Sequence, residues 1–486
     1  MTASSKRKRA ATKAQASSKV PKITAATITP PPDGAFQPKS LQTVVSEEEL
    51  EIAVETLTSL AQYPGLIKTK ACKDLRAAVH EFRQACTTGV NSVGGTNLTA
   101  RITGAIADEK YLDAMILLAE MRIRGEEPKL GALCRWVRDL DVISGLSTIP
   151  GDADDALIER SEEAKARINV IDAILRVTGP VDSNPDARPA SSSPIVLQKA
   201  WDLRPSTPSQ QVRASVLDKS VFATAPLDLS TQIRAIETTP GLLRKPPNHH
   251  DAIVYTTSPG AIPLSASHPP ITYHSHPTVP ALSLAMNLLS PDECKAIVAA
   301  GECVNFIPDA PLREGEDISI LAHNFYWVVD QAFHDALWAR LAPSVPSSLD
   351  GRLARGLNRR FRVYRYVPGA EYRAHIDGAW PPSAILEGDK YVYDGSPADR
   401  KQSSLFTLLI YLNDEFEGGE TTFFVPAVRE RTLNAYPVRP VMGAAAVFPH
   451  GDVRGALLHE GTGVRKGAKY VIRTDIEYDI EPTEGL

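Results

Sequence analysis

Hydrophobic residues follow a helical spacing in the first part of this chain of 486 residues. Between residues 46 and 178 the apolar positions recur three and four residues apart, and the segments with the clearest pattern are VSEEELEIAVETLTSLAQY, LDAMILLAEMRIRG and ALIERSEEAKARINVIDAILRV. Ser46 and Glu49 have the spacing of a capping box at the start of the first segment. The pattern predicts an α-helical domain over residues 46–178.

The hydrophobic pattern changes after Ala281. ALSLAMNLL has the composition of a strand, SPDE at Ser290–Glu293 has the capping residues of a helix start, and NFYWVVDQAFHDALWARL predicts a second helix. Strand-like runs follow, separated by Gly, Pro, Asn and Asp: RRFRVYRYV, YRAHIDGA, SLFTLLIYL, GGETTFF, VMGAAAVF and KYVIRTDIEY. Two helices and then these strands predict a closed or double-sheet β domain with flanking helices over residues 281–480.

Two segments show neither the helical nor the strand spacing of apolar residues. Residues 179–280 are rich in Pro, Ser, Thr and Ala, which predicts a linker or an irregular chain lying over a neighbouring domain. Histidines are frequent in this segment at spacings that match no metal site, so we interpret them as linker residues: His249, His250, His268, His274 and His276. Residues 1–45 are predicted to form a basic, disordered tail.

Composition and charge narrow the class of protein. The chain is 43% hydrophobic with a formal net charge of −5, which is ordinary for a soluble globular protein and gives no general attraction to nucleic acid. No apolar run approaches the length of a membrane span, and the five cysteines are odd in number with no C-x-x-C spacing. Residues 1–22 carry seven Lys or Arg and no acid, including Lys6-Arg7-Lys8-Arg9. This tail resembles a nuclear localisation signal and lacks the apolar face of a mitochondrial presequence, so we expect a nuclear or cytoplasmic protein.

The stretch EYRAHIDGAW contains the residues that suggest a metal centre. His375 and Asp377 are two positions apart in a predicted strand, so both side chains point to the same side. A facial iron site takes a third ligand, commonly a second histidine, and leaves its other positions open. His459 in LLHEG is the candidate third ligand, while the rival interpretation is an ordinary polar pair on a strand.

Ten residues after His459, the run KYVIRTDIEY alternates cleanly between two faces. Tyr470, Ile472, Thr474, Ile476 and Tyr478 share the face that resembles core, whereas Lys469 and Arg473 lie on the other face. A buried lysine needs an anionic partner. A bound carboxylate would supply one.

This set of motifs resembles the prolyl 4-hydroxylase branch of the Fe(II)- and 2-oxoglutarate-dependent dioxygenases. The matching parts occur in the expected order: RYVPGAEYRAHID, LLIYLNDEFEGGETTFF, and MGAAAVFPHG with LLHEGTGVRKGAKYVIRTDI. The resemblance covers residues 282–478 and implies a double-stranded β-helix, or jelly roll. It also implies Fe(II), 2-oxoglutarate, O₂ and L-ascorbate as the metal, the cosubstrates and the reductant.

Residue roles follow from the resemblance by position. The iron ligands would be His375, Asp377 and His459, with no catalytic residue beyond the metal centre. Lys469 would pair with the distal carboxylate of 2-oxoglutarate, and weaker candidates for cosubstrate contact are Tyr366, Tyr411, Thr407 and Arg473. A second His-x-Asp copy, His450-Gly451-Asp452, is interpreted as a turn, and residues 378–402 as either a lid over the substrate or a surface loop.

The implied activity is hydroxylation of an unactivated C–H bond with release of succinate and CO₂. A prolyl or other side chain of an intracellular protein is the expected substrate, and a small molecule stays open. A nucleic-acid-binding protein or a scaffold with an idle jelly roll is the alternative. Its support is the basic tail and ITGAIADEKYLDAMILLAEMRIRGEEP, within residues 97–130, which resembles a single pentatricopeptide repeat. A solenoid needs about three such units, so a helical hairpin packed on the C-terminal domain is the preferred interpretation.

Overall fold

The structure is a computed structural model that describes residues 45–88, 97–144, 160–188, 193–206, 211–226, 228–312, 322–451 and 453–482. The chain divides into two compact units, Met1–Gly95 and Thr96–Leu486. The basic tail and Asp452 lie outside the described residues.

The first unit contains α1 (Glu47–Ala61), α2 (Pro64–Ile67) and α3 (Lys73–Thr88). The predicted capping box is present, because the Ser46 side chain accepts the Glu49 N–H while the Glu49 carboxylate accepts the Ser46 N–H. No described side chain of these helices is buried. The apolar residues of these helices thus keep a helical spacing, but the described side chains form no buried core.

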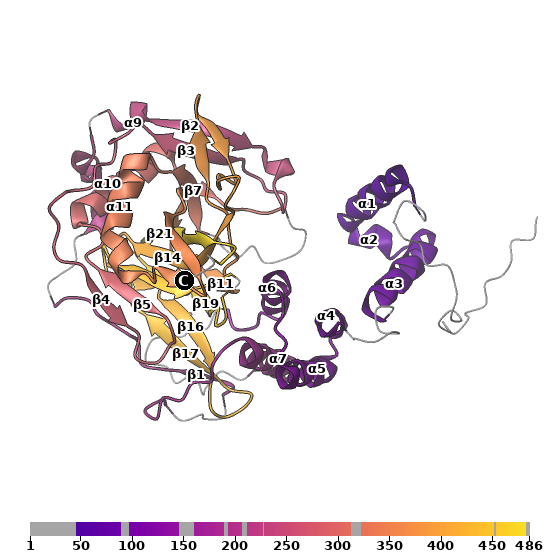
Figure 1. Cartoon of the computed structure of the whole chain (residues 1–486). Coiled ribbons are helices and arrows are strands. Elements are labelled where there is room, and N and C mark those ends of the chain that lie inside the picture. The colour runs from indigo at the N-terminus through magenta and orange to yellow at the C-terminus, as the bar shows by residue number, and fades with distance from the viewer. Residues whose placement is uncertain are drawn as a thin grey trace, which may run out of the picture. The chain divides into compact units, whose positions relative to one another are not determined.

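The second unit holds the remaining elements (Figure 1). Its helices are α4 (Leu98–Ala107), α5 (Tyr111–Arg124), α6 (Leu130–Asp139), α7 (Glu162–Thr178), α8 (Val212–Leu217), α9 (Leu229–Gln232), α10 (Pro291–Val304) and α11 (Gln331–Leu341). Its longer strands are β2 (Ile233–Thr239), β3 (Ala252–Thr257), β4 (Thr272–Ser275), β5 (Ser283–Met286), β7 (His323–Val328), β9 (Arg352–Leu357), β10 (Arg360–Tyr366), β11 (Tyr372–His375), β14 (Gln402–Tyr411), β16 (Thr421–Pro426), β17 (Leu433–Val438), β18 (Ala445–Pro449), β19 (Leu458–Gly461) and β21 (Lys469–Asp479). The short strands are β1 (Ile195–Leu197), β6 (Ile307–Pro308), β8 (Ser348–Leu349), β12 (Ala384–Leu386), β13 (Lys390–Val392), β15 (Glu417–Gly418) and β20 (Val464–Lys466).

Two sheets form the centre of this unit. The smaller has the order β1-β17-β16-β19-β11, and the larger has the main order β2-β3-β7-β10-β21-β14-β18-β5-β4. Tyr470, Ile472 and Ile476 of β21 belong to the core that includes α10 and α11, as the alternating sequence predicts. Helices together with many strands in large sheets fit the jelly roll that we expect.

Helices α4–α7 pack on the smaller sheet. Their buried side chains, such as Trp136 and Ile171, share one core with Ala374, Phe424 and Leu458 from that sheet. The residues that resemble a pentatricopeptide repeat form the α4–α5 hairpin of this layer. The helical region expected over residues 46–178 is thus divided at Gly95, because its second part buries its apolar faces against strands and its first part does not.

The segment expected to be a linker is an integral part of the second unit. β1 adds a parallel strand to the smaller sheet, and β2, β3 and β4 extend the larger one. His276 is buried, and its Nδ1 accepts the backbone N–H groups of Thr278 and Val279. Interpreting 179–280 as a linker was therefore wrong for the described residues. The strands form there because the edges of the two sheets provide hydrogen-bond partners that the sequence of the segment does not reveal.

Candidate active site

His375 and His459 lie directly opposite each other in the antiparallel pair β11–β19. Their ligand atoms and a carboxylate oxygen of Asp377 all lie within 4.8 Å of one another. The Nδ1 of His375 is 2.8 Å from the Arg373 carbonyl, and the Nδ1 of His459 is 3.0 Å from the Leu457 carbonyl. A carbonyl only accepts, so both rings carry their proton on Nδ1. The lone pairs on both Nε2 atoms are therefore free to bind a metal, as is usual for a histidine ligand whose other ring nitrogen donates to a carbonyl.

Asp377 stays ionised in this site. Burial alone would raise the pKa of its carboxyl, but the positive charge of Arg473 outweighs burial and holds that pKa well below its usual value. Burial and the neighbouring His375 lower the pKa of His459 to about 4, so its imidazole is neutral near pH 7. Two imidazoles and one carboxylate are a donor set suited to Fe(II).

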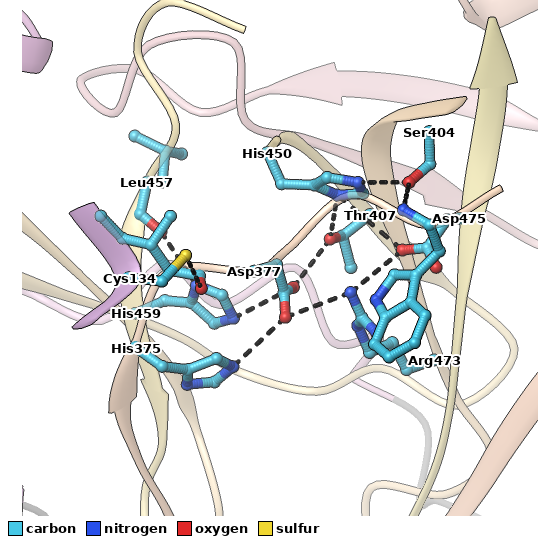
Figure 2. A network of polar contacts seen from close by, with 12 residues as sticks. Cys134, His375, Asp377, Ser404, Thr407, His450, Leu457, His459, Arg473 and Asp475 are labelled. Carbon is cyan, nitrogen blue, oxygen red and sulfur yellow. Dashed lines mark hydrogen bonds and ion pairs between the residues drawn. The ribbon is translucent and has the colours of Figure 1, made fainter. Parts of the chain in front are cut away.

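A chain of hydrogen bonds supports Asp377 from behind (Figure 2). The Thr407 hydroxyl donates to Asp377 Oδ2 at 2.7 Å, so it accepts the Nδ1–H of His450, which is 2.7 Å away. The other ring nitrogen, Nε2, then accepts the hydroxyl of Ser404 at 2.8 Å. Burial lowers the pKa of His450 to about 3, which keeps the ring neutral. This chain fixes one orientation of the carboxylate.

The structure adds to what the sequence predicted for His450 and Thr407. His450 does precede a turn, where Gly451 has a φ of 69°, but its ring is buried in the network behind Asp377. Thr407 faces the same cavity as the metal candidates and contacts Asp377. The second His-x-Asp motif does not predict this role from the sequence, because it is the pairing of β14 with β18 that brings His450 beside Thr407.

Arg473 lies beside Asp377, on the side away from His375 and His459 (Figure 2). Its Nη2 is 3.3 Å from Asp377 Oδ1 and 3.2 Å from Asp475 Oδ1. Burial raises the pKa of Asp475 to about 7, although the charge of Arg473 opposes that shift. Arg473 thus stabilises the charge of Asp377 and also faces the cavity.

Lys469 is buried and lines the same cavity. Within the described part of the chain its Nζ makes no hydrogen bond or ion pair, and it lies 5.5 Å from the ring centre of Tyr366 and 5.7 Å from that of Tyr411. Burial lowers the pKa of Lys469 to about 8, although the charge of Glu420 opposes the shift. A buried ammonium without a carboxylate partner fits an anionic ligand.

One cavity of about 420 Å³, open to solvent at its mouth, joins these groups. Of the residues expected from the sequence, His375, Asp377, His459, Lys469, Tyr366, Thr407 and Arg473 line it. Tyr411 does not line it; its hydroxyl lies 2.9 Å from that of Thr421. Tyr364, Tyr372 and Thr421 line the cavity without having been expected, and the Tyr372 ring lies 4.3 Å from that of His375.

The helical layer holds the strand that carries the His-x-Asp motif. β11 is an edge strand of the smaller sheet, so one of its sides has no strand partner. Ser144 Oγ accepts the Ala374 N–H at 2.7 Å, and Asp141 Oδ2 accepts the Arg373 Nε–H at 2.8 Å. Cys134 Sγ donates to the Ile376 carbonyl at 3.4 Å. These contacts satisfy the free edge directly beside the metal candidates.

Comparison with known families and proteins agrees with this geometry. Residues 361–474 match the model of the 2OG-Fe(II) oxygenase superfamily. A human protein, transmembrane prolyl 4-hydroxylase, is 28% identical over 154 residues, which cover 25% of this chain and 30% of that protein. The chain thus spans less than a third of the length of this relative. The superfamily implies Fe(II) and 2-oxoglutarate.

Solved structures give weaker likenesses. The viral collagen prolyl hydroxylase of Paramecium bursaria chlorella virus-1 is 19% identical, with 41% of this chain and 97% of that chain covered and a TM-score of 0.26. A prolyl-4-hydroxylase of Pseudomonas putida is 17% identical, with coverages of 45% and 90% and a TM-score of 0.24. These figures describe a partial likeness.

The expected nuclear or cytoplasmic location is contradicted by the human relative, which is named as a transmembrane protein. Among the described residues, none of the helices combines the length and the apolar character required to span a bilayer. The basic tail on which that expectation rested lies outside the described residues. The location of the protein is therefore not assigned.

Proposed function

We propose, on the premise that residues 361–474 belong to the 2OG-Fe(II) oxygenase superfamily, that this protein is an Fe(II)- and 2-oxoglutarate-dependent dioxygenase that hydroxylates an unactivated C–H bond. The observation that carries the proposal is the joint presence, in one cavity, of a facial His-Asp-His set and a buried lysine with no partner among the described residues. A prolyl or other side chain of a protein is the proposed substrate, which is supported by the name of the human relative.

The side chains fit the metal that the superfamily implies. His375 and His459 would bind it through their Nε2 atoms, and Asp377 would bind it through its carboxylate. Fe(II) held there, together with 2-oxoglutarate and O₂, would supply the oxidant for C–H hydroxylation, with succinate and CO₂ as coproducts. L-Ascorbate is proposed as the reductant that restores Fe(II).

The side chains of this protein would bind the cosubstrate, hold the metal ligands in position and exclude water from the cavity. Lys469 would pair with the distal carboxylate of 2-oxoglutarate, since its ammonium is buried and no carboxylate lies within ion-pair distance in the described part of the chain. Thr407 and Arg473 hold the charge of Asp377 in place. Leu409, Phe448 and Val471 give the same cavity apolar walls, which strengthens these electrostatic interactions by excluding water. No residue is required to accept a proton.

Anaerobic titration of the protein with Fe(II) and 2-oxoglutarate tests the proposal without knowledge of the substrate. We expect a visible charge-transfer band that is absent in His375→Ala. Lys469→Ala should need at least tenfold more 2-oxoglutarate for the same band, because a buried charged contact contributes more than 1.4 kcal/mol. Arg400→Gln, at an exposed arginine outside the cavity, is the matched control and should behave as the unmodified protein. Folded, iron-loaded protein without a band would contradict the proposed function.

A further inference from the structure

A second pocket lies beside the candidate active site. Its volume is about 450 Å³ including the open mouth, and Arg473 lines both cavities. Arg360 and Arg362 of β10 and Asp475 of β21 line the second pocket as well. Arg473 is therefore a wall that the candidate active site and this pocket share.

Arg360 has an unusual environment for an arginine. Its guanidinium carbon is 4.4 Å from the ring centre of Tyr326 and 5.6 Å from that of Trp380, so two aromatic rings hold it. Within the described residues its guanidinium makes no ion pair or hydrogen bond, and its buried Nε has no acceptor. Arg362, in contrast, pairs with Asp309 at 2.8 Å, and Arg473 pairs with Asp377 and Asp475. Arg360 is thus a positioned cation whose donors are available to a ligand.

The part of the pocket wall that follows Asp377 in the chain is fixed by hydrogen bonds. The side-chain amide of Asn358, which is buried, donates to the Pro381 carbonyl at 2.9 Å and accepts the Ser383 N–H at 3.2 Å. The Trp380 N–H donates to Ser404 Oγ at 2.9 Å. The start of the segment expected to be a lid is therefore pinned to the strands beneath it. A pre-formed pocket loses less entropy on binding than a flexible one.

The charged side chains that line the second pocket determine which kind of ligand it can bind. Three guanidinium groups and one carboxylate face the pocket, and Asp475 is already paired with Arg473. A planar carboxylate matches the donor geometry of a guanidinium, whereas a cationic group would be repelled. We infer that this pocket binds an acidic side chain of a peptide substrate, with Arg360 as the specificity-determining residue; the inference rests on the proposed function.

The register of the strands gives the position of that acidic residue. Arg362 pairs directly with Arg473 across β10 and β21, and Arg360 is two residues further along β10. With the usual spacings of strands, the Cα atoms of Arg360 and Arg473 are about 8 Å apart, or two to three residues of an extended peptide. The acidic residue should therefore lie two or three positions from the residue that is hydroxylated.

Peptides of Gly and Ala with a central proline test this inference on the full chain. Each peptide carries one glutamate at a position from −4 to +4, and its partner carries glutamine there. Hydroxylation is followed by mass spectrometry and succinate release. We expect kcat/KM to be about 10- to 100-fold higher for a glutamate peptide than for its glutamine partner when the glutamate lies two or three positions from the proline. This is the usual range for a charge-assisted hydrogen bond.

Variants separate charge recognition from loss of folding. Arg360→Gln should remove the preference for glutamate, and Arg360→Glu should prefer peptides that carry lysine at the same position. Arg400→Gln, on an exposed side chain, should keep the glutamate preference. Fe(II) and 2-oxoglutarate binding is measured on each variant to establish that the site is intact.

The outcomes distinguish this inference from the proposed function. A protein that binds Fe(II) and 2-oxoglutarate but hydroxylates no peptide, shows no glutamate preference, or keeps that preference in Arg360→Gln overturns the inference alone. A wild-type protein that binds neither Fe(II) nor 2-oxoglutarate contradicts the proposed function itself.

Discussion

The hydrogen bond between Thr407 and Asp377 provides the most informative single substitution. Thr407→Val keeps nearly the same side-chain shape and removes the hydroxyl that donates to Asp377 Oδ2 and accepts from His450 Nδ1. Thr407 is 1% exposed, so water cannot replace the hydroxyl without rearrangement. The change therefore leaves a carboxylate with one bond fewer and a buried imidazole N–H without its acceptor.

The expected magnitude has two parts. A hydrogen bond to a charged group contributes roughly 1.5–3 kcal/mol, and an orphaned buried donor costs about 1–3 kcal/mol. Because both belong to one network they are not additive, and we expect about 3 kcal/mol of lost unfolding free energy. Outer-shell partners of a metal ligand typically change metal affinity by about 10- to 100-fold, so metal affinity should fall within that range.

Two measurements check this prediction. Urea denaturation of the metal-free protein gives the change in stability, and Mn(II) titration followed by the paramagnetic resonance of the free ion gives the change in metal affinity. Thr474→Val is the matched control: Thr474 is equally buried and donates at 2.7 Å to the Asn358 carbonyl, away from the ligands. It should lower stability by about 1 kcal/mol with unchanged metal affinity. Mn(II) affinity within twofold of wild type in Thr407→Val would refute the supporting role of the network.

Three further predictions concern pH, the helical layer and a buried histidine. Burial lowers the pKa of Lys469 to about 8, so 2-oxoglutarate affinity should fall about tenfold per pH unit above 8 as the ammonium is lost, whereas Lys469→Arg should give a flat profile by calorimetry up to pH 9. Ser144→Ala removes an acceptor from the edge of β11 and should weaken Mn(II) binding severalfold, with Ser144→Thr restoring it; equal binding in all three proteins would exclude a positioning role. Burial lowers the pKa of His276 to about 4, against a usual value of 6.5. The unfolded chain therefore takes up a proton below pH 6.5 that the folded chain does not, and stability is lost as pH falls toward 4. His276→Asn should reduce the slope of stability against pH by about 1.4 kcal/mol per unit in denaturation series at pH 7, 6 and 5, and an unchanged slope would contradict the burial of this ring.

The metal candidates and the lysine could be predicted from the sequence because strands have a period of two. His375 and Asp377 must share a face of their strand, and the alternation of β21 separates Lys469 and Arg473 from the core-facing Tyr470 and Ile472. These features depend on neighbours in the chain, and the structure places each of them on the expected side.

Only the tertiary structure shows what surrounds those residues. His450 supports Asp377 because β14 and β18 are paired, and Ser144 supports β11 because α6 packs on an edge strand. The strands between residues 179 and 280 form because sheet edges far away in the sequence accept them. Periodicity states which way a side chain points within its own element. Partners from distant elements are fixed by packing and register, and a single sequence does not contain those distances.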